Sequence, residues 1–491
     1  MSSAEQTASA AGQEAETLDL LDQVITATRP QTDQEAARAK DYFRQFLNQV
    51  VKPGEVISKD VETNVKHWIA QIDGVLTHQL NEILHNPDFQ KLESSWRGLH
   101  YLVHQSETGE NLKIRVLNVS KRDLFKDLEK AAEFDQSALF KKIYEEEYGQ
   151  LGGQPYGMLV GDYDFGRGPE DISLLKMISN VAAASHAPFI AATSPKMFNF
   201  DSYTELANPR DLAKIFDSVE YASWKSFRES EDSRFVGLTL PKTLGRLPYG
   251  AEFKRVEEFN FEEFVDGKDH DKYLWMSAAW TYAARITDSF SKWGWFARTR
   301  GVEGGGRVEG LPVHTFPTDD GDVAMKCPTE IAITDRREFE LSNLGFLPLI
   351  HAKGTDYAVF MGAQSCQKPK TYFDPAANAN AELSAKFNLI LCTSRFAHYL
   401  KVMARDKIGS FMEVKDCAQW LNDWIQNFVC DPNGASDETK AKFPLADAKV
   451  EVREVEGRPG WYEAVAYLRP HYQLEALTTS MRLVAEVPKK G

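Results

Sequence analysis

Long hydrophobic runs, cysteine pairs and an excess of basic residues are all missing from this chain. No run reaches the roughly eighteen apolar residues that a membrane-spanning helix needs, so direct membrane insertion is not expected. Only five cysteines occur, an odd number without a C-x-x-C pair, which argues against a disulfide framework and favours reduced thiols. Asp and Glu (72) outnumber Lys and Arg (57), and a net charge of -15 argues against nucleic acid as a partner, because phosphate binding needs a basic surface.

The first residues also lack a hydrophobic signal core. Met1 to Glu14 are small, polar or acidic, so we expect no secretory signal and a cytoplasmic protein. What the chain does have is length and apolar content. Its 491 residues, 43% hydrophobic and 26% charged, are typical of a globular protein with two or more domains.

Residues 156–192 have the pattern of a strand-helix-strand unit. Tyr156 to Val160 reads as a short apolar strand, and Gly161 to Gly168 as a turn. Pro169 stands where a helix can begin without losing a hydrogen bond, and the apolar run Phe189 to Ala192 follows as a second strand. Such units build parallel sheets with right-handed crossovers, so the predicted fold class is α/β. The expected buried positions of the helix, spaced by three and four, are Leu174, Leu175, Ile178, Val181 and Ala182.

Two pairs of residues resemble metal or acid sites. Asp162 and Asp164 lie in the expected turn, where we predict that they cap backbone amides before the helix at Pro169, since Asp satisfies such donors well. His100 and His104 lie four apart on an expected helix, but the H-E-x-x-H pattern and a third ligand are not evident. We therefore predict core or interface histidines, and no metal site.

The glycine-rich run E-G-G-G-R-V-E-G, residues 303–310, is the best enzyme-like signal. Consecutive glycines can wrap backbone amides around a phosphate, so a cytosolic enzyme that uses Gly304 to Gly306 as a phosphate site is one alternative function. However, the run matches neither G-x-x-x-x-G-K-[ST] nor G-x-G-x-x-G, and Glu303 and Glu309 would repel an anion. A structural loop is the preferred interpretation, and we expect neither a cofactor nor catalysis. A stand-alone binding module is a further alternative.

Composition and periodicity separate four regions. Residues 1–16 carry too little apolar surface to order themselves and are predicted to be a disordered tail. Residues 17–110 have helical periodicity and form a helical N-terminal region and linker. Residues 111–375 form a central α/β part, which we expect to open with a strand at Leu112 to Val119. Residues 376–491 hold helices followed by strands.

In the last region, Ala376 to Ala404 looks like one long helix and Ser410 to Val429 a second, with Ser410 and Glu413 at capping-box spacing. Strands at the end of a chain leave open edges, and an open edge can pair with another chain. The strand-like segments are Lys449 to Val455, Trp461 to Leu468 and Leu474 to Val484.

Six long blocks of sequence occur together in one order. They are Leu92 to Val103, Asp162 to Phe198, Trp224 to Pro241, Tyr273 to Ala283, Arg300 to His314 and Arg337 to Leu349. These blocks closely resemble the large sheath subunit of the bacterial type VI secretion system, the TssC (VipB) family. The resemblance covers nearly the whole chain from about Leu18 onward.

The resemblance implies a multi-domain contractile tail-sheath-like subunit without a catalytic site. Such subunits pair with the small sheath subunit TssB (VipA), and the resulting protomers stack helically around a tube of Hcp hexamers on a baseplate. The sheath then contracts and drives the tube and its spike toward a target cell. Non-closing heterologous interfaces of this kind generate helical polymers.

The resemblance also assigns residues to contacts between subunits. In this family chain ends pair with strands of neighbouring protomers, and the candidates here lie in the C-terminal strands: Trp461, Val465, Tyr467, Leu474, Leu477 and Leu483. Three charged residues in the part of the chain that the resemblance covers are candidates for contacts with the tube or between subunits, although plain surface charge is the alternative for each: Lys225, Asp335 and Glu382.

An N-terminal helix of the family is recognised by the AAA+ unfoldase ClpV, which dismantles contracted sheaths. Leu18 to Pro30 resembles that helix, and it carries a narrow apolar stripe. The alternative is a helix that docks on its own chain or on the small subunit. The residues that could enter a groove of the unfoldase are Leu20, Leu21, Val24 and Ile25.

Overall fold

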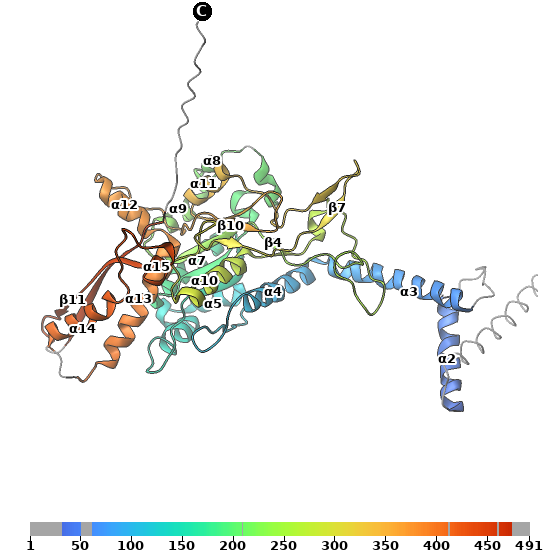
Figure 1. Cartoon of the computed structure of the whole chain (residues 1–491), viewed down its shortest axis with the longest axis horizontal. Helices are drawn as coiled ribbons and strands as arrows, with labels where there is room; N and C mark the ends of the chain where they lie inside the picture. Colours follow the sequence, from blue (N-terminus) through green and yellow to red (C-terminus); the bar gives the residue numbers. More distant parts are fainter. Residues whose placement is uncertain (1–31, 51–60, 209, 411–412, 459–460, 474–491) are drawn as a thin grey trace, which may run out of the picture. The chain divides into compact units, whose positions relative to one another are not determined.

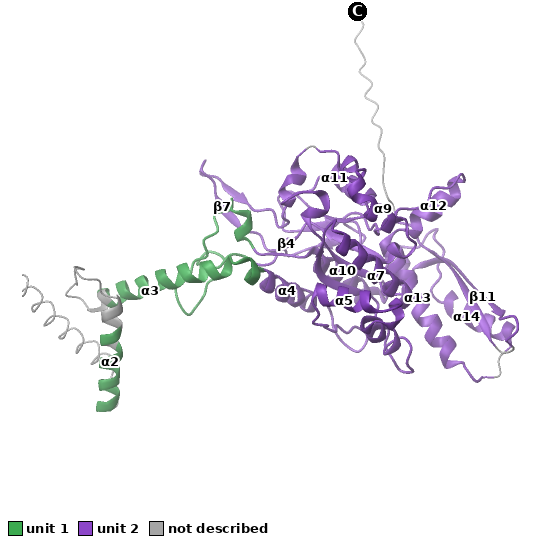
Figure 2. Ribbon diagram, turned by 180° about the vertical axis from the view of Figure 1, so that it is seen from behind, with its two compact units in different colours: residues 1–90, 247–273 green, residues 91–246, 274–491 purple. Residues whose placement is uncertain are grey.

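The structure, a computed structural model, describes most of the chain, in five segments: residues 32–50, 61–208, 210–410, 413–458 and 461–473 (Figure 1). Contacts divide the chain into two units, which Figure 2 colours separately. The first comprises residues 1–90 and 247–273, and the second comprises residues 91–246 and 274–491. Within the described segments, no helix is both long and apolar enough to cross a membrane.

The second unit is built around a six-stranded sheet with the strand order β1-β2-β3-β9-β10-β6. The first four strands in this order run parallel, and the last two extend the sheet with antiparallel pairing. The α/β class and the parallel strand-helix-strand unit are confirmed. The strands are β1 (Leu159–Phe165), β2 (Phe189–Thr193), β3 (Val236–Leu240), β9 (Leu347–His351), β10 (Ala358–Phe360) and β6 (Arg307–Val308).

Helices cover both faces of this sheet because its central strands are apolar on both sides. In β2, Phe189 and Ala191 belong to one buried cluster, whereas Ile190 between them belongs to another. α7 (Pro169–Ser185) packs in the first cluster, and its five predicted apolar positions are all buried. α10 (Ala278–Trp293) packs in the second.

A third apolar cluster belongs to the C-terminal helices and strands. It joins α13 (Phe387–Asp406), α14 (Val414–Gln426) and the two strands β11 (Leu445–Glu454) and β12 (Tyr462–Pro470). Trp295, which follows α10 in the chain, stacks on Phe396 of α13 with ring centroids 4.1 Å apart. The C-terminal part therefore has its own small core.

The first unit combines N-terminal helices with an excursion from the middle of the chain. Its helices include α2 (Asp33–Val50) and α3 (Val61–Leu84), both within the region 17–110 that was predicted to be helical. The buried amide of Asn81 donates to the Glu262 carbonyl (2.9 Å) and accepts from the Phe264 amide (2.7 Å). Asn81, together with His78, whose ring lies edge-on to that of Phe264 (centroids 6.4 Å apart), thus holds residues 247–273 against α3.

Shorter elements complete the described chain. The other α-helices are α4 (Pro87–His104), α5 (Lys121–Lys130), α6 (Ala138–Phe140), α8 (Leu212–Phe216), α9 (Ala222–Glu229), α11 (Asp335–Asn343), α12 (Pro375–Ser384) and α15 (Asp437–Lys442). A π-helical turn is η2 (Lys141–Glu145), and the 3-10 turns are η1 (Phe134–Gln136), η3 (Pro195–Phe198), η4 (Tyr203–Ala207), η5 (Val219–Tyr221), η6 (Asp232–Phe235) and η7 (His270–Lys272). Two small ribbons pair β4 (Thr243–Leu244) with β5 (Trp275–Met276), and β7 (Thr315–Pro317) with β8 (Val323–Met325).

Two strand predictions in the α/β part were wrong. β1 runs from Leu159 to Phe165, so most of the expected turn after Val160 is strand, because its backbone pairs with β2 as far as Thr193. Leu112 to Val119 is not part of any sheet of the described chain. The alternation of its side chains was real, but alternation alone does not supply a neighbouring strand.

Two helix predictions in the C-terminal part were also wrong. The expected single helix from Ala376 breaks into α12 and α13 at Ala385, whose carbonyl accepts the Ser365 amide (3.0 Å), while the Phe387 amide donates to the Ala363 carbonyl (2.7 Å). The expected capping box at Ser410 is absent, since its hydroxyl donates back to the Lys407 carbonyl (2.7 Å). α14 begins after Glu413 without a side-chain cap.

Candidate intersubunit interface

β11 and β12 form a hairpin of their own, separate from the six-stranded sheet. The strands pair antiparallel from Asp447 opposite Arg469 to Glu454 opposite Tyr462. One face of this C-terminal hairpin packs on the helices of the third cluster, and the other face is turned away from them. The residues of β11 that are buried against the helices are Leu445, Ala448 and Val450.

The outer edge of β11 is covered by side chains of α14. The amide group of Asn422 donates to the Val450 carbonyl (2.6 Å) and accepts from the Val450 amide (2.9 Å). Gln426 donates to the Ala448 carbonyl (2.8 Å). These bonds satisfy backbone groups that a further strand would otherwise use, so α14 closes this edge.

Among the described residues, nothing pairs with the outer edge of β12. In an antiparallel ladder, two facing residues either exchange hydrogen bonds or both point their backbone groups outward. Val450 bonds outward to α14, so Ala466, which faces it, points outward from β12, as do Ala464 and Leu468 two positions away. Within the described residues, no hydrogen bond reaches these three outward positions from beyond the hairpin. We call them the open edge.

The structure brings the described members of the predicted interface to one side of β12. Val465 and Tyr467 alternate with the residues that face α14, so they share the face that is turned away from the helices. Tyr467 is 52% exposed, and Trp461, just before the strand, is 61% exposed. A large aromatic next to an open edge is typical of an association surface.

Charged residues of β11 lie across from these side chains. Glu451 faces Val465 and accepts hydrogen bonds from Lys449 (2.9 Å) and Arg453 (3.0 Å). The bond to Lys449, with help from Arg453, lowers the pKa of the Glu451 carboxyl, and the same bond raises the pKa of Lys449. The face of the hairpin that is turned away from the helices therefore combines a row of apolar side chains on β12 with a row of charged side chains on β11.

The remaining predicted contact residues have different outcomes. Lys225 on α9 makes an ion pair with Asp217 (3.4 Å) and is a surface residue. Asp335 is the exposed first residue of α11, where a carboxylate suits the helix dipole, and Glu382 is exposed on α12. The structure does not link these three residues to one another. Several predicted positions lie outside the described residues: Leu20, Leu21, Val24, Ile25, Leu474, Leu477 and Leu483.

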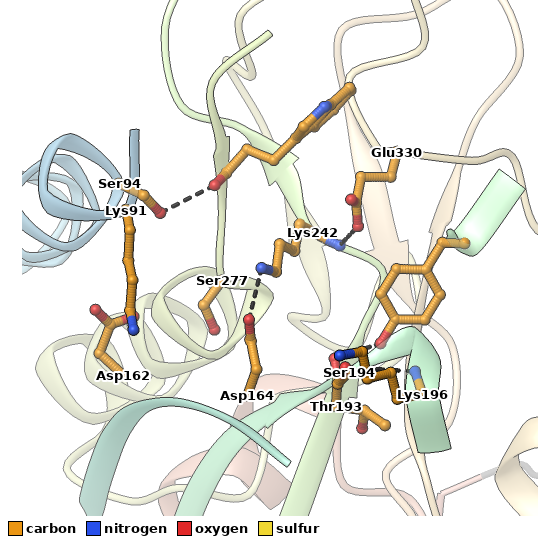
Figure 3. Close-up of polar contacts among 12 residues, drawn as sticks. Lys91, Ser94, Asp162, Asp164, Thr193, Ser194, Lys196, Lys242, Ser277 and Glu330 are labelled. Atoms are coloured by element: carbon orange, nitrogen blue, oxygen red, sulfur yellow. Dashed lines mark hydrogen bonds and ion pairs between the residues drawn. The ribbon is translucent and has the colours of Figure 1, made fainter. Parts of the chain in front are cut away.

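A polar cluster lies at the carboxyl ends of β1, β2 and β3, where α/β enzymes commonly bind ligands (Figure 3). Asp164 makes an ion pair with Lys242 (2.7 Å), whose backbone amide donates to Glu330 (2.9 Å). Burial alone would lower the pKa of Lys242, but Asp164 and the other nearby acids raise it by more than burial lowers it. The pKa therefore lies above its ordinary value, and Lys242 stays charged. Asp164 and Lys242 thus neutralise each other, and the Glu330 carboxylate is held by a backbone amide.

The prediction that Asp162 and Asp164 cap α7 was wrong, because both lie on β1. Asp162 accepts hydrogen bonds from Ser95 and from Trp280 Nε1 (3.1 Å) and so joins α4 to α10. The N-cap of α7 is Gly168, which has no side chain. The nearby Gly166 amide instead donates to Asp171 (2.7 Å).

The glycine-rich loop is packed against backbone. The Gly301 amide donates to the Phe360 carbonyl (2.7 Å), and the Gly306 amide donates to the Gly301 carbonyl (2.9 Å). A Cβ atom on Gly304, Gly305 or Gly306 would come within 2.5 Å of a backbone oxygen, which explains the glycines. These two amides are therefore committed within the protein and do not line a phosphate cradle.

His100 and His104, the two histidines on α4, pack against each other. Their rings stack with centroids 3.7 Å apart, and Nδ1 of His104 lies 2.9 Å from the carbonyl of His100. Over the described residues, no three His, Cys, Asp or Glu side chains lie in positions that could hold a metal ion.

Comparison with known proteins identifies the family. The VipB tail sheath N-terminal domain matches residues 66–367, and the VipB tail sheath gpW/gp25-like domain matches residues 376–487. The type VI secretion system sheath protein TssC1 of Pseudomonas aeruginosa is 55% identical over 463 residues, 94% of this chain and 93% of that protein. The chain belongs to the TssC (VipB) sheath family. As a TssC family member it is a structural sheath protein and not an enzyme, and the C-terminal hairpin lies in its gpW/gp25-like domain.

Two solved structures are more distantly similar to this TssC family chain. In the baseplate of the anti-feeding prophage, one chain is similar over 76% of this chain and 84% of that chain, with 8% identity and a TM-score of 0.36. The contracted helical sheath of the same particle matches 63% and 66%, with 10% identity and a TM-score of 0.32. At these TM-scores the likeness adds nothing to the assignment.

Sequence reasoning missed the residues that decide which edge of the hairpin is open. Asn422 and Gln426 lie four apart on α14, next to the buried Leu421 and Ile425. Asn422 is half-buried and Gln426 is exposed, and amides beside an apolar helix side can bond the backbone groups of a strand that packs there. That signal was present in the sequence, but its target on β11 was not.

Proposed function

We propose that this chain is the large subunit of a type VI contractile sheath in the bacterial cytoplasm. It forms a heterodimer with the small sheath subunit TssB (VipA), and the heterodimers polymerise helically around the Hcp tube on a baseplate. Contraction of the polymer propels the tube and its spike. The observation that carries this proposal is the open edge of β12 in a member of the TssC family.

The open edge suits a contact that must survive contraction. Added strands are held by backbone hydrogen bonds, which do not depend on a particular set of side-chain contacts. Subunits can therefore rotate while the added strand stays paired. The exposed Tyr467 and Trp461 add apolar area to the same contact. The C-terminal segment that contains Leu474, Leu477 and Leu483 is the proposed strand that reaches a neighbouring protomer.

Electron microscopy of this chain, coexpressed with the small sheath subunit of the same system, tests the proposal. Long hollow tubes with a ridged outer surface are expected, and each subunit should be present in equal amounts. Only globular particles across several salt concentrations would contradict the proposal and favour a binding module. A melting temperature raised by phosphate or nucleotides would instead favour the enzyme alternative through the Gly304 to Gly306 loop.

We further propose that the unfoldase ClpV recognises the predicted helix over Leu18 to Pro30. Its apolar stripe would enter a groove of the unfoldase, and a charge on that stripe would leave a carboxylate in an apolar site. Leu21→Glu and Val24→Glu should each weaken binding of the assembled sheath to ClpV at least tenfold in a pull-down titration. Gln23→Glu adds the same charge off the stripe and serves as the control. Equal binding of all three variants would contradict this role.

A further inference from the structure

Residues 113–119 are extended but belong to no sheet. They lie between α4 and α5, and none of their backbone amides donates a hydrogen bond within the described chain. The centre of this segment is also apolar and open, since Val116 is 69% exposed and Leu117 is 53% exposed. A strand-like backbone with unused donors can accept another strand.

Side chains hold this segment in place although no strand of the described chain pairs with its backbone. Arg115 makes an ion pair with Glu147, and Lys113 donates to Gln154 (2.9 Å). The hydroxyl of Tyr163, on β1, donates to the Val119 carbonyl (2.8 Å). Ile114 and Val119 pack against two different apolar clusters. Because the segment is already fixed, an added strand would not have to order it.

The charge of this region distinguishes among possible occupants. From Leu112 to Arg122 there are four basic residues and no acidic residue. Two of them are paired with acids elsewhere in the chain, Arg115 with Glu147 and Lys121 with Asp171 (2.7 Å), which leaves Lys113 and Arg122 as excess positive charge in a chain of net charge -15. Residues 474–491 of a second copy hold two Glu against one Arg and two Lys, which gives +1. They do not complement the segment. An acidic extended segment of a different polypeptide does, and residues 1–22 of this chain, with five acidic residues and no basic one, are the rival that hydrogen exchange of the chain alone tests.

We propose that residues 113–119 bind an extended, acidic segment of the small sheath subunit as an added strand within the heterodimer. This proposal rests on the proposed function, which supplies the partner. It assigns to the α/β domain a second strand-addition site, separate from the open edge of β12. The heterodimer would then be held at residues 113–119, while β12 links neighbouring protomers.

Hydrogen exchange of the full chain, alone and in the purified heterodimer, tests the proposal. In the chain alone, amides 113–119 should exchange close to the rate of an unstructured peptide, since they have no acceptor. In the heterodimer, their exchange should slow at least tenfold. If the two subunits copurify and these amides exchange as before, the inference is wrong while the proposed function stands. Protection that appears only in assembled tubes would also overturn it, in favour of a second copy.

A pair of charge reversals tests the acidic character of the occupant. Arg122 is exposed at the second position of α5, beside the segment, and Arg336 is exposed at the second position of α11. Arg122→Glu should slow heterodimer formation roughly three- to tenfold at low salt, with a smaller effect at high salt. Arg336→Glu, matched in helix position and charge, should leave the rate unchanged. Equal effects of both variants, or none from either, would contradict the acidic occupant.

Discussion

The central sheet and the C-terminal hairpin follow the same rule of alternation but use their surfaces in opposite ways. In the central sheet both faces are buried, and β2 sends alternate side chains into two separate cores. In the hairpin only one face is buried, and β12 keeps both an open edge and an exposed aromatic face. The sheet is complete within one chain, whereas the hairpin, in our proposal, is completed by another chain.

This difference predicts two kinds of variant. Changes in the central sheet should lower the stability of the isolated subunit, and sheaths should disappear because the subunit unfolds. Changes at the open edge of β12 should leave the isolated subunit stable but prevent assembly. Measuring unfolding and assembly on the same variants therefore separates the two regions.

The largest effect on stability is expected in the central core. Phe346 is fully buried, stacked on Trp224 with centroids 5.5 Å apart and in contact with Phe198 at 5.0 Å. Phe346→Ala should lower the free energy of unfolding by about 3–5 kcal/mol in urea titrations. Phe373→Ala removes the same side chain from a fully exposed position and should change it by less than about 0.5 kcal/mol. Similar losses for both would contradict the assignment of the core.

Two neighbouring proline substitutions distinguish the hydrogen-bonded side of β12, which faces β11, from its open edge. The Val465 amide points toward β11, so Val465→Pro should remove a ladder bond and lower the free energy of unfolding by about 3 kcal/mol. The Ala466 amide points outward, so Ala466→Pro should cost less than about 1 kcal/mol, because proline is tolerated at strand edges.

Assembly gives the decisive readout for Ala466→Pro. This variant should stay folded by circular dichroism and thermal melting but form no tubes with the small subunit. Normal tubes would mean that the outward face of β12 is not a strand-addition site. Severe destabilisation by Ala466→Pro, with Val465→Pro tolerated, would mean that the Ala466 amide, and not the Val465 amide, donates to β11. The assignment derived from Asn422 would then be reversed.

The sequence was sufficient for elements that depend on a single segment. α7 was predicted from Pro169 and its apolar spacing, and β2 and both C-terminal strands of the hairpin were found from short apolar or alternating runs. Where local pattern and tertiary contact disagreed, the contact decided. The helix breaks at Ala385 because residues 363–365, which precede it in the chain, form hydrogen bonds with the backbone of Ala385 and Phe387.

The candidate interface was only partly predictable for the same reason. Trp461, Val465 and Tyr467 could be selected because they are large and apolar in a terminal strand. The open edge could not be assigned, because it depends on the hydrogen bonds between Asn422 and Val450, 28 residues apart. The unpaired state of residues 113–119 was equally hidden, since alternation predicts an extended backbone but not its neighbour.

A smaller, pH-dependent effect is expected where α13 meets the central domain. His398 on α13 is buried, and its Nε2 lies 2.9 Å from the Ser185 carbonyl of α7. Burial, with the nearby Arg395, His186 and Lys401, lowers its pKa to about 3. Because the unfolded chain binds this proton near its ordinary pKa, the stability is complete above about pH 6.5 and is lost as the pH falls toward 3.

Urea titrations at pH 7 and pH 5 measure this effect. This one group should lower the free energy of unfolding by about 2 kcal/mol between the two pH values. His398→Gln keeps a donor for the Ser185 carbonyl but cannot take up the proton, so the loss should shrink by that amount. His78→Gln, at an exposed position, is the control and should leave the loss unchanged. An unchanged loss in His398→Gln would mean that other groups cause the acid sensitivity.

The smallest effects on stability are expected from the three surface charges, and they decide whether side chains outside the strands take part in assembly. Lys225→Glu, Asp335→Lys and Glu382→Lys should each change the free energy of unfolding by less than about 0.5 kcal/mol, since all three are exposed. Lys214→Glu, at another exposed cation, controls for charge alone. If one of the three variants folds normally but gives few tubes, or tubes without Hcp, while Lys214→Glu assembles, that residue lies in a lattice or tube contact. If all four assemble and contract normally, the three charges serve only as solvated surface, and assembly depends on the strand edges.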